Sequence, residues 1–296
     1  MGGPISLNLL KAKYSLVVND LRPSASRAIV DAGALWAGDV KQVAEVSDIV
    51  FTSLPRPIDV ESIAGDLISN MREGSVWIDL TTNSPTLVRQ LHQRCAIRGV
   101  SLLDAPVSGG PRGARSGKLA IWVGGDRKVF DNALDILSVI GDQVLYIGPI
   151  GTGLVAKLVN NAAHYTIQTA LAEIFAIGVK GGVAPLALWE ALRQGSSGRM
   201  RTFDRLGRHF LRGVFEPPDF ALNLAHKDIR LVTELARDLG IPSRITELTY
   251  AEMTEALNRG WGNRDSRVAM LLQEERAGIQ IQESEDEIQA VLTRDP

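Results

Sequence analysis

A single lysine stands among small and aliphatic residues in the stretch Gly151–Asn161, GTGLVAKLVNN. If this stretch is helical, Lys157 and Asn161 are four residues apart and share one face. Apolar surroundings lower the pKa of an ammonium group, so such a lysine can exchange a proton with a bound substrate. The pattern therefore indicates acid–base chemistry at Lys157, with Asn161 as its neighbour. The structural alternative is a lysine that reaches solvent from a core helix.

A second stretch, Asp104–Leu119, reads DAPVSGGPRGARSGKL and offers a hydroxyl, Ser108, followed by the adjacent glycines Gly109 and Gly110. Glycine lets backbone N–H groups come close to a ligand, and successive amides of this kind bind anions. A substrate carboxylate is the expected guest of this loop. The alternative is an ordinary surface turn.

The elements that must carry these residues alternate between strands and helices. This alternation predicts an α/β fold with a mostly parallel, doubly wound sheet of the Rossmann type and helices on both faces. The expected strands are Leu16–Asn19, Ile49–Ser53, Val76–Leu80, Val100–Ala105, Leu119–Val123 and Val144–Ile147.

In such a sheet a dinucleotide lies across the carboxyl ends of the strands, with its pyrophosphate at the start of the first helix. Asp20 follows the second strand of the pattern, roughly 20 residues beyond the glycine turn, where an acidic residue binds the ribose. Gly2 matches only the third glycine of that turn. We therefore expect the first strand and the preceding G-x-G to be missing from this chain. A flexible glycine end with no such turn is the alternative.

The pattern changes to helices after Ile147, which predicts a dinucleotide-binding domain over residues 1–150 and an all-α domain over residues 151–296. A helix from Gly153 to Gly182 would be about 45 Å long at about 1.5 Å per residue. We expect it to pass from one domain into the other and to be buried on most sides. The tail after Gln282 is expected to be a frayed helix or disordered.

The overall composition narrows the function classes. A chain of 296 residues with a formal net charge of −2 offers no electrostatic case for nucleic acid or an anionic membrane. The single cysteine, Cys95, excludes an internal disulfide and a cysteine-built metal site, and the four scattered histidines disfavour any metal. No apolar run predicts a membrane span. The expected compartment is the cytoplasm.

In combination, DAPVSGG, GARSGKL, GTGLVAKLVNN and Lys227-Asp228-Ile229 resemble the β-hydroxyacid dehydrogenase family, which includes 3-hydroxyisobutyrate dehydrogenase and tartronate semialdehyde reductase. The resemblance implies an oxidoreductase that transfers a hydride between NAD(P) and a small 3-hydroxy acid, or that reduces the matching semialdehyde. It also implies a homodimer or homotetramer.

The resemblance further implies roles for individual residues. Lys157 corresponds to the catalytic general acid/base. The implied substrate contacts are Ser108, Gly109, Gly110, Asn161 and Phe220. The implied cofactor contacts are Gly2, Asp20, Leu54, Pro55, Thr82 and Lys227.

Asp20 also favours NAD over NADP, because a carboxylate repels a 2′-phosphate and accepts a hydrogen bond from a 2′-hydroxyl; the nearby Arg22 weakens that choice. His164, seven residues after Lys157, is a rival acid on the same side of the helix. Two other readings of the whole chain remain open. One is a shortened, non-catalytic homologue, and the other is an imine reductase of the same superfamily.

Overall fold

The computed structural model describes residues 1–199, 204–223, 225–226, 229, 233, 237, 240–278 and 280–294, some of them by their backbone only. The chain divides into two compact units, Met1–His164 and Tyr165–Pro296. The division falls inside one long helix, α8 (Thr152–Lys180). The predicted domain boundary, between residues 150 and 151, lies just before this helix.

The first unit contains a six-stranded sheet with the order β3-β4-β5-β7-β6, in which β8 also pairs with β7. Neighbours β3, β4 and β5 run parallel, as do β7 and β8, whereas β7 runs antiparallel to β5 and β6. The predicted Rossmann-type sheet is confirmed. Its strands are β3 (Ile49–Thr52), β4 (Val76–Asp79), β5 (Ser101–Asp104), β6 (Val107–Ser108), β7 (Leu119–Gly124) and β8 (Gly141–Gly148).

The six-stranded sheet ends at β3 and does not include the two strands that precede β3 in the chain. The strands β1 (Val17–Val18) and β2 (Leu35–Trp36) form a separate parallel pair, and neither is bonded to β3. In a Rossmann-type sheet another strand lies between these two positions, because the first strand separates the second from the fourth, and among the described residues no strand pairs with β3 on that side.

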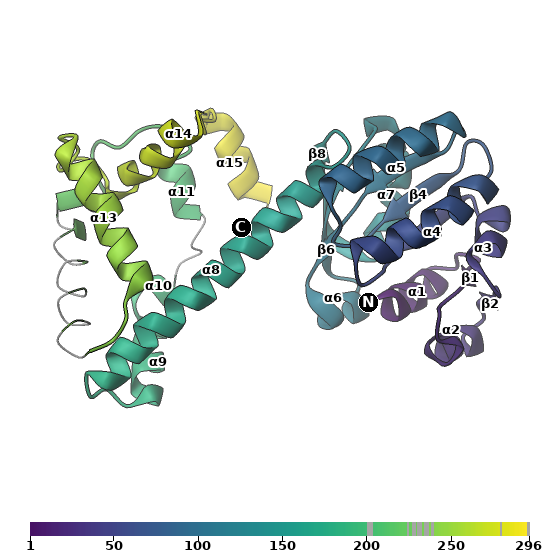
Figure 1. Ribbon diagram of the computed structural model, residues 1–296, viewed down its shortest axis with the longest axis horizontal. Helices are drawn as coiled ribbons and strands as arrows, with labels where there is room; N and C mark the ends of the chain where they lie inside the picture. Colours follow the sequence, from purple (N-terminus) through teal and green to yellow (C-terminus); the bar gives the residue numbers. More distant parts are fainter. Residues whose placement is uncertain are drawn as a thin grey trace. The chain divides into compact units, whose positions relative to one another are not determined.

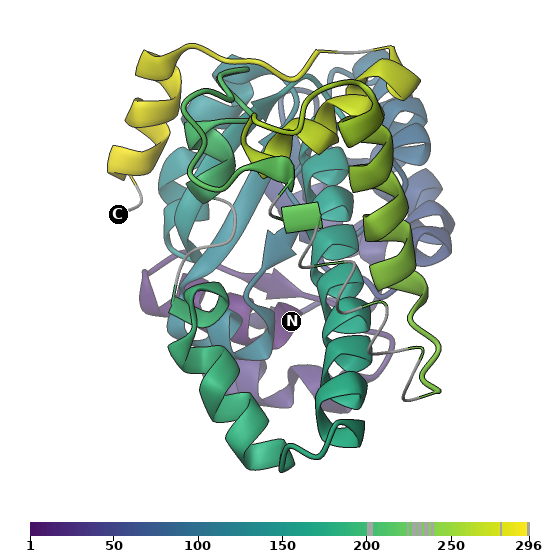
Figure 2. The same ribbon diagram turned by 90° about the vertical axis from the view of Figure 1, so that its left-hand side faces the viewer.

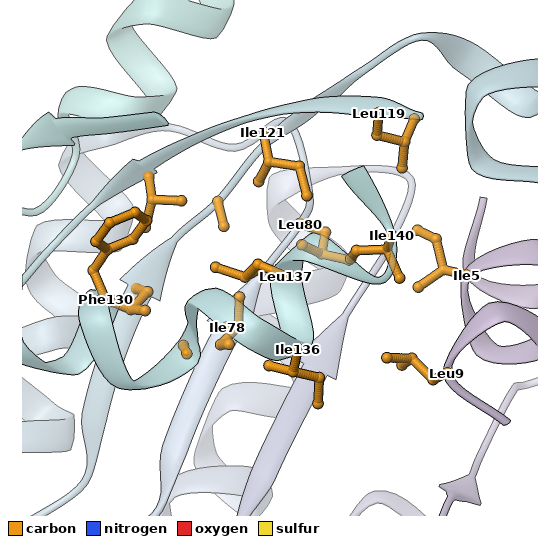
Figure 3. Packing of buried hydrophobic residues seen from close by; sticks show 14 of the residues in the cluster. Ile5, Leu9, Ile78, Leu80, Leu119, Ile121, Phe130, Ile136, Leu137 and Ile140 are labelled. Carbon is orange, nitrogen blue, oxygen red and sulfur yellow. The ribbon is translucent and has the colours of Figure 1, made fainter. Parts of the chain in front are cut away.

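Alternating residues of the central strands enter two different hydrophobic clusters, because successive side chains of a strand point to opposite faces. Trp77 packs with helices α4 (Pro57–Asn70) and α5 (Pro85–Ile97), which cover the face turned to the viewer in Figure 1. The next residue, Ile78, packs on the opposite face with α1 (Gly2–Lys11) and α7 (Arg127–Ser138). Figure 3 shows this second cluster, in which Leu137 lies near the middle and Ile5 and Leu9 of α1 lie at one edge. The sheet is therefore covered on both sides.

Three short elements of this unit were not expected from the sequence. Strands β2 and β6 have two residues each, too few to show a period-two pattern. The third is helix α6 (Gly110–Ser116), which begins inside the predicted glycine loop. Glycine and serine are weak helix formers, so the composition of this segment did not indicate a helix. The remaining helices of this unit are η1 (Pro23–Ser26), α2 (Arg27–Asp31) and α3 (Val40–Val46).

Helix α8 corrects one expectation. We expected it to be buried on most sides, but Val155, Leu158 and Val159 are 44 %, 41 % and 63 % exposed. When a helix has apolar residues on all sides, its sequence does not indicate which face packs against the rest of the protein. Only contact with the strands does so, and in the first unit that face carries Gly153 and Lys157.

The described part of the second unit consists of helices joined by loops, with an isolated bridge between Ala221 and Asp265. Figure 2 shows its helices in teal, green and yellow. Its own core joins Phe210, Phe215 and Leu222 to residues of the later helices. The tail Gln282–Pro296, expected to be a frayed helix or disordered, contains helix α15 in its described part. The elements are α9 (Pro185–Gln194), α10 (Ser196–Arg199), α11 (Asp204–Arg208), α13 (Arg244–Asn258), η2 (Ser266–Met270), α14 (Leu271–Ala277) and α15 (Glu285–Arg294).

Among the described residues, no helix combines the length and the apolar character needed to cross a lipid bilayer.

Candidate active site

The start of helix α8 is held by a buried carboxylate at the end of strand β5. Asp104 has no exposed surface. Its Oδ1 accepts a hydrogen bond from the Gly151 amide at 2.6 Å, and its Oδ2 accepts one from the Leu154 amide at 2.8 Å. These amides belong to the turn that opens the helix, where backbone donors have no partner within it. Burial raises the pKa of Asp104 to about 6, although the two amides act in the opposite direction.

Gly153 lets the helix approach the sheet closely. A Cβ atom at this position would overlap the Trp122 carbonyl oxygen and would lie only 3.0 Å from the Asp104 carboxylate. Gly153, Lys157 and Asn161 follow one another at intervals of four residues, so they lie on one side of the helix. The side that carries Lys157 is therefore the side packed on β5 and β7.

Lys157 is 8 % exposed. Its Nζ lies 5.8 Å from the centroid of the Trp122 ring. Burial lowers the pKa of this lysine from its ordinary value. Asn161, one turn further along, is half-buried, and its side-chain oxygen accepts a long hydrogen bond from Asn160 at 3.5 Å. A lysine in this state can accept or donate a proton where its neighbours are apolar.

The Ser108 loop is paired with β7, the strand that also carries Trp122. Ser108 ends β6 and is paired with Ala120 of β7. Gly109 and Gly110 follow with φ angles of 122° and 60°, in the region that side chains disfavour. Both glycines are exposed, and their amides begin helix α6. This backbone can present successive N–H groups to an anion.

Strand β7 thus brings the two predicted parts of the substrate site together. Ala120 pairs with Ser108, and Trp122, two residues on, lies under the Lys157 amine. Two residues of a strand span about 6.8 Å. The Trp122 amide also donates to the carbonyl of Pro106, which fixes the chain just before Ser108. The strand partner of Ser108 and the ring beside the Lys157 amine are therefore two residues apart on β7.

The start of α1 lies beside the loop that follows β3. A Cβ atom on Gly2 would be 3.8 Å from that of Ser53. No side chain caps the first amides of this helix, so they can bind a phosphate group. Further along, Asn8 Nδ2 donates to the Ala114 carbonyl at 2.8 Å and joins α1 to α6. The helices that follow the predicted phosphate turn and the Ser108 loop are thereby connected.

A buried carboxylate that the sequence did not reveal organises the next two loops. Asp79, at the end of β4, accepts hydrogen bonds from Thr52 Oγ1 at 2.8 Å, Asn83 Nδ2 at 3.0 Å and the Thr81 amide at 3.1 Å. Burial raises its pKa, and these donors oppose the shift. The available signal was an acidic residue closing a buried strand, VWID, a pattern that Asp104 repeats in SLLD.

The loops held by Asp79 carry three of the predicted cofactor contacts. The Leu54 amide, just before Pro55, donates to Thr81 Oγ1 at 3.0 Å. Thr81 is buried, whereas Thr82, its neighbour, is exposed at the carboxyl end of the sheet. The Leu54-Pro55 loop and Thr82 are therefore brought together.

Asp20 follows β1 and is exposed, and its Oδ1 accepts the Arg22 amide at 2.8 Å. Phe220 belongs to the second unit and is 45 % exposed. Lys227 lies outside the described residues, as does the side chain of His164.

In the described part of the second unit, His209, Asp219 and Asp265 offer ligand atoms within 4.8 Å of one another. Arg267 Nη1, however, bonds Asp265 Oδ1 at 2.7 Å and already supplies positive charge there. Asp265 Oδ2 accepts the Phe220 amide at 3.3 Å. This cluster therefore holds the segment that ends at Phe220.

Comparisons with known proteins agree with this architecture. Residues 1–148 match the family described as the NAD binding domain of 6-phosphogluconate dehydrogenase. Residues 151–272 match the family described as NAD-binding of NADP-dependent 3-hydroxyisobutyrate dehydrogenase. These two matches meet at the start of helix α8.

Similar proteins carry dehydrogenase names. A 2-(hydroxymethyl)glutarate dehydrogenase of Eubacterium barkeri is 32 % identical over 95 % of this chain and 94 % of its own length. A 3-hydroxyisobutyrate dehydrogenase of Pseudomonas aeruginosa is 39 % identical over 67 % of each chain. The solved structure of the Mycobacterium tuberculosis 3-hydroxyisobutyrate dehydrogenase with L-serine is 25 % identical, with a TM-score of 0.64 over 92 % of this chain and 95 % of that one.

An imine reductase from Pseudomonas sp. has a TM-score of 0.75 over 91 % of this chain and 94 % of its own, at 16 % identity. At that identity the likeness shows the fold alone.

Proposed function

The chain belongs to the β-hydroxyacid dehydrogenase family, and from this premise we propose that it oxidises a small 3-hydroxy acid, or reduces the matching semialdehyde, with Lys157 as general acid/base. One observation carries the proposal. The buried amine of Lys157 and the Ser108 loop are both anchored on the same three residues of strand β7.

The residues present fit a dinucleotide. The uncapped amides at the start of α1 suit a pyrophosphate, and the Leu54-Pro55 loop and Thr82 lie at the carboxyl ends of β3 and β4, where the nicotinamide half binds in this fold. When bound, the nicotinamide supplies the acceptor or donor of the hydride. Asp20 supports NAD over NADP, because it offers a carboxylate at the carboxyl end of β1.

The chain's own residues handle the proton and the carboxylate. In the oxidation direction, neutral Lys157 Nζ accepts the proton of the substrate hydroxyl, and in reduction the protonated amine returns it. Apolar surroundings strengthen this interaction because they exclude competing water. Ser108 Oγ and the Gly109 and Gly110 amides hold the carboxylate, and Asn161 orients the hydroxyl or the amine.

The substrate class follows from what the relatives' names share. 3-Hydroxyisobutyrate, 2-(hydroxymethyl)glutarate and L-serine each carry a hydroxymethyl group on the carbon that bears a carboxylate. A site that offers a loop for the carboxylate and an amine for the hydroxyl suits these molecules, because it binds the two groups that all three have in common. We therefore favour a 3-hydroxypropanoate substituted at its second carbon.

A substrate panel tests the proposal. 3-Hydroxyisobutyrate, L-serine, 2-(hydroxymethyl)glutarate and, as a control, a 2-hydroxy acid are incubated with NAD or NADP while nicotinamide absorbance is followed. We expect turnover of at least one 3-hydroxy acid, none of the 2-hydroxy acid, and loss of turnover in Lys157→Ala. Full turnover by Lys157→Ala would refute the assigned role.

The cofactor preference has its own test. Asp20→Ala removes the carboxylate and should lower kcat/KM with NAD about tenfold, the usual size of one lost charge-assisted hydrogen bond. Asp31→Ala, which removes another exposed acidic residue of the same region, is the matched control. An unchanged ratio of NAD to NADP efficiency in Asp20→Ala would contradict the preference.

Two further properties extend the proposal. The exposed apolar residues Val155, Leu158 and Val159 of α8 support a homodimer or homotetramer, which size-exclusion chromatography with light scattering would detect. The cytoplasm remains the proposed compartment, which fractionation of producing cells would test.

A further inference from the structure

The contacts at the start of helix α8 concern the reaction as well as the fold. Asp104 is fully buried and uses one carboxylate oxygen for the Gly151 amide and the other for the Leu154 amide. A carboxylate with both oxygens occupied fixes the height and the rotation of the first helical turn. Ordinary capping residues in this unit do less, because they lie at the surface. Asp126, for example, caps α7 through one oxygen only and is exposed.

Lys157 follows this turn directly. Three residues separate Leu154 from Lys157, a rise of about 4.5 Å along a helix. Gly153, between the two capped amides, has no space for a Cβ atom against Trp122 and Asp104. The helix is therefore fixed at its capped end and along its packed side. As a result, the backbone of Lys157 can move little relative to Asp104.

The other part of the site starts from the same residue. Asp104 is four residues before Ser108, and the intervening chain is held by the Trp122 amide, which donates to Pro106. Both groups that would contact the substrate are consequently connected to one residue, the amine through the Asp104 carboxylate and the loop through the Asp104 backbone. Burying a carboxylate costs free energy that a cap at the surface would not. A role in positioning both the amine and the loop accounts for its burial here.

We propose that Asp104 is a positioning residue, which sets the Lys157 amine at the correct distance from the Ser108 loop through the Gly151 and Leu154 amides. The inference rests on the function proposed above for Lys157. Asp104 itself touches neither substrate nor cofactor in this arrangement.

Asp104→Asn tests the inference, because it keeps the shape but turns an NH₂ group towards one of the two amides. A displacement of the order of 1 Å at a reacting group can cost about 10²-fold in rate. We expect kcat to fall by at least tenfold, with the dinucleotide Kd unchanged within about twofold. Asp126→Asn is the control. It makes the same change at a cap in the same unit that uses one oxygen only, which the Asn oxygen can replace, and it should leave kcat unchanged for each folded molecule.

Chemical rescue separates positioning from a purely structural role. In Lys157→Ala, methylammonium from solution replaces the missing amine and is not attached to α8. The rescued rate should therefore be nearly the same in Lys157→Ala and in Lys157→Ala with Asp104→Asn. A rescued rate that falls as far as Asp104→Asn lowers kcat in the wild-type background would overturn the inference, as would an Asp104→Asn variant that keeps kcat within twofold.

If Asp104→Asn does not fold, Asp104→Ser supplies one acceptor in place of two and should also lower kcat. Wild-type kcat in a folded Asp104→Ser variant also contradicts the inference. Lys157→Ala alone separates the proposed function from the role of Asp104. Full turnover in Lys157→Ala refutes the proposed function. Loss of turnover in Lys157→Ala together with normal kcat in Asp104→Asn refutes only the role of Asp104.

Discussion

The amine of Lys157 lies 5.8 Å from the centre of the Trp122 ring, inside the first unit and largely out of solvent. An aromatic face attracts a cation, whereas burial disfavours it. Burial lowers the pKa of Lys157 from its ordinary value. The neutral amine is therefore more accessible here than it would be in water.

Lys157→Met should remove turnover while the protein keeps or gains stability. General acid–base catalysis is commonly worth about 10²–10⁴-fold in rate, so kcat should fall by that factor. The folded-state pKa of Lys157 lies below its unfolded value, so the protonated lysine destabilises the fold at neutral pH, and Met removes that cost. Steady-state kinetics and thermal unfolding would measure the two effects. Lys128→Met, at an exposed position of α7, is the control.

The pH dependence of the reaction should follow Lys157. Oxidation requires the neutral amine, so kcat/KM should rise with pH and level off below the ordinary lysine value of 10.5. Reduction requires the protonated amine, and its rate should fall over the same range. Initial rates in both directions across a pH series would measure this. The assignment fails if the residual activity of Lys157→Met shows the same rise.

Gly153→Ala should damage both stability and turnover. The added Cβ atom would overlap the Trp122 carbonyl oxygen and force the helix off the sheet. Overpacking of this kind costs about 1–3 kcal/mol. Gly65→Ala in α4 is the matched control, since its nearest neighbour, Arg94 Nη2, is 4.0 Å away. That variant should gain about 0.5–1 kcal/mol, because Ala is the better helix former. Urea denaturation would compare them, and equal changes would contradict the account of Gly153.

Thr81→Val should weaken dinucleotide binding. The substitution keeps the shape of the side chain but removes the oxygen that accepts the Leu54 amide. An amide left without a partner costs about 1–3 kcal/mol, so Kd should rise about tenfold if the Leu54-Pro55 loop contacts the cofactor. Fluorescence titration with the reduced dinucleotide would measure Kd. Thr86→Val, at an exposed position of α5, should leave it unchanged, and a similar shift in both variants would argue against the loop.

Much of the fold could be predicted because its strands are continuous apolar runs. Ile49–Thr52, Val76–Asp79 and Ser101–Asp104 lie within one residue of their predicted bounds. Elements without such a signal were missed. The two-residue strand β6 exists because Val107 and Ser108 pair with β7, and no local pattern encodes a partner that far along the chain.

The sequence by itself determined the chemistry available to this protein. It supplied one lysine at helical spacing from an asparagine, a Ser-Gly-Gly loop and an acidic residue, Asp20, at the end of a short apolar run. These residue types limit which protons and anions the site can handle. Only the tertiary structure decided that Asp104 and Asp79 are buried, that Gly153 contacts the sheet, and that Trp122 lies under Lys157. Burial and long-range pairing depend on segments separated by up to about fifty residues, and those relationships set the pKa of the lysine and the position of its amine.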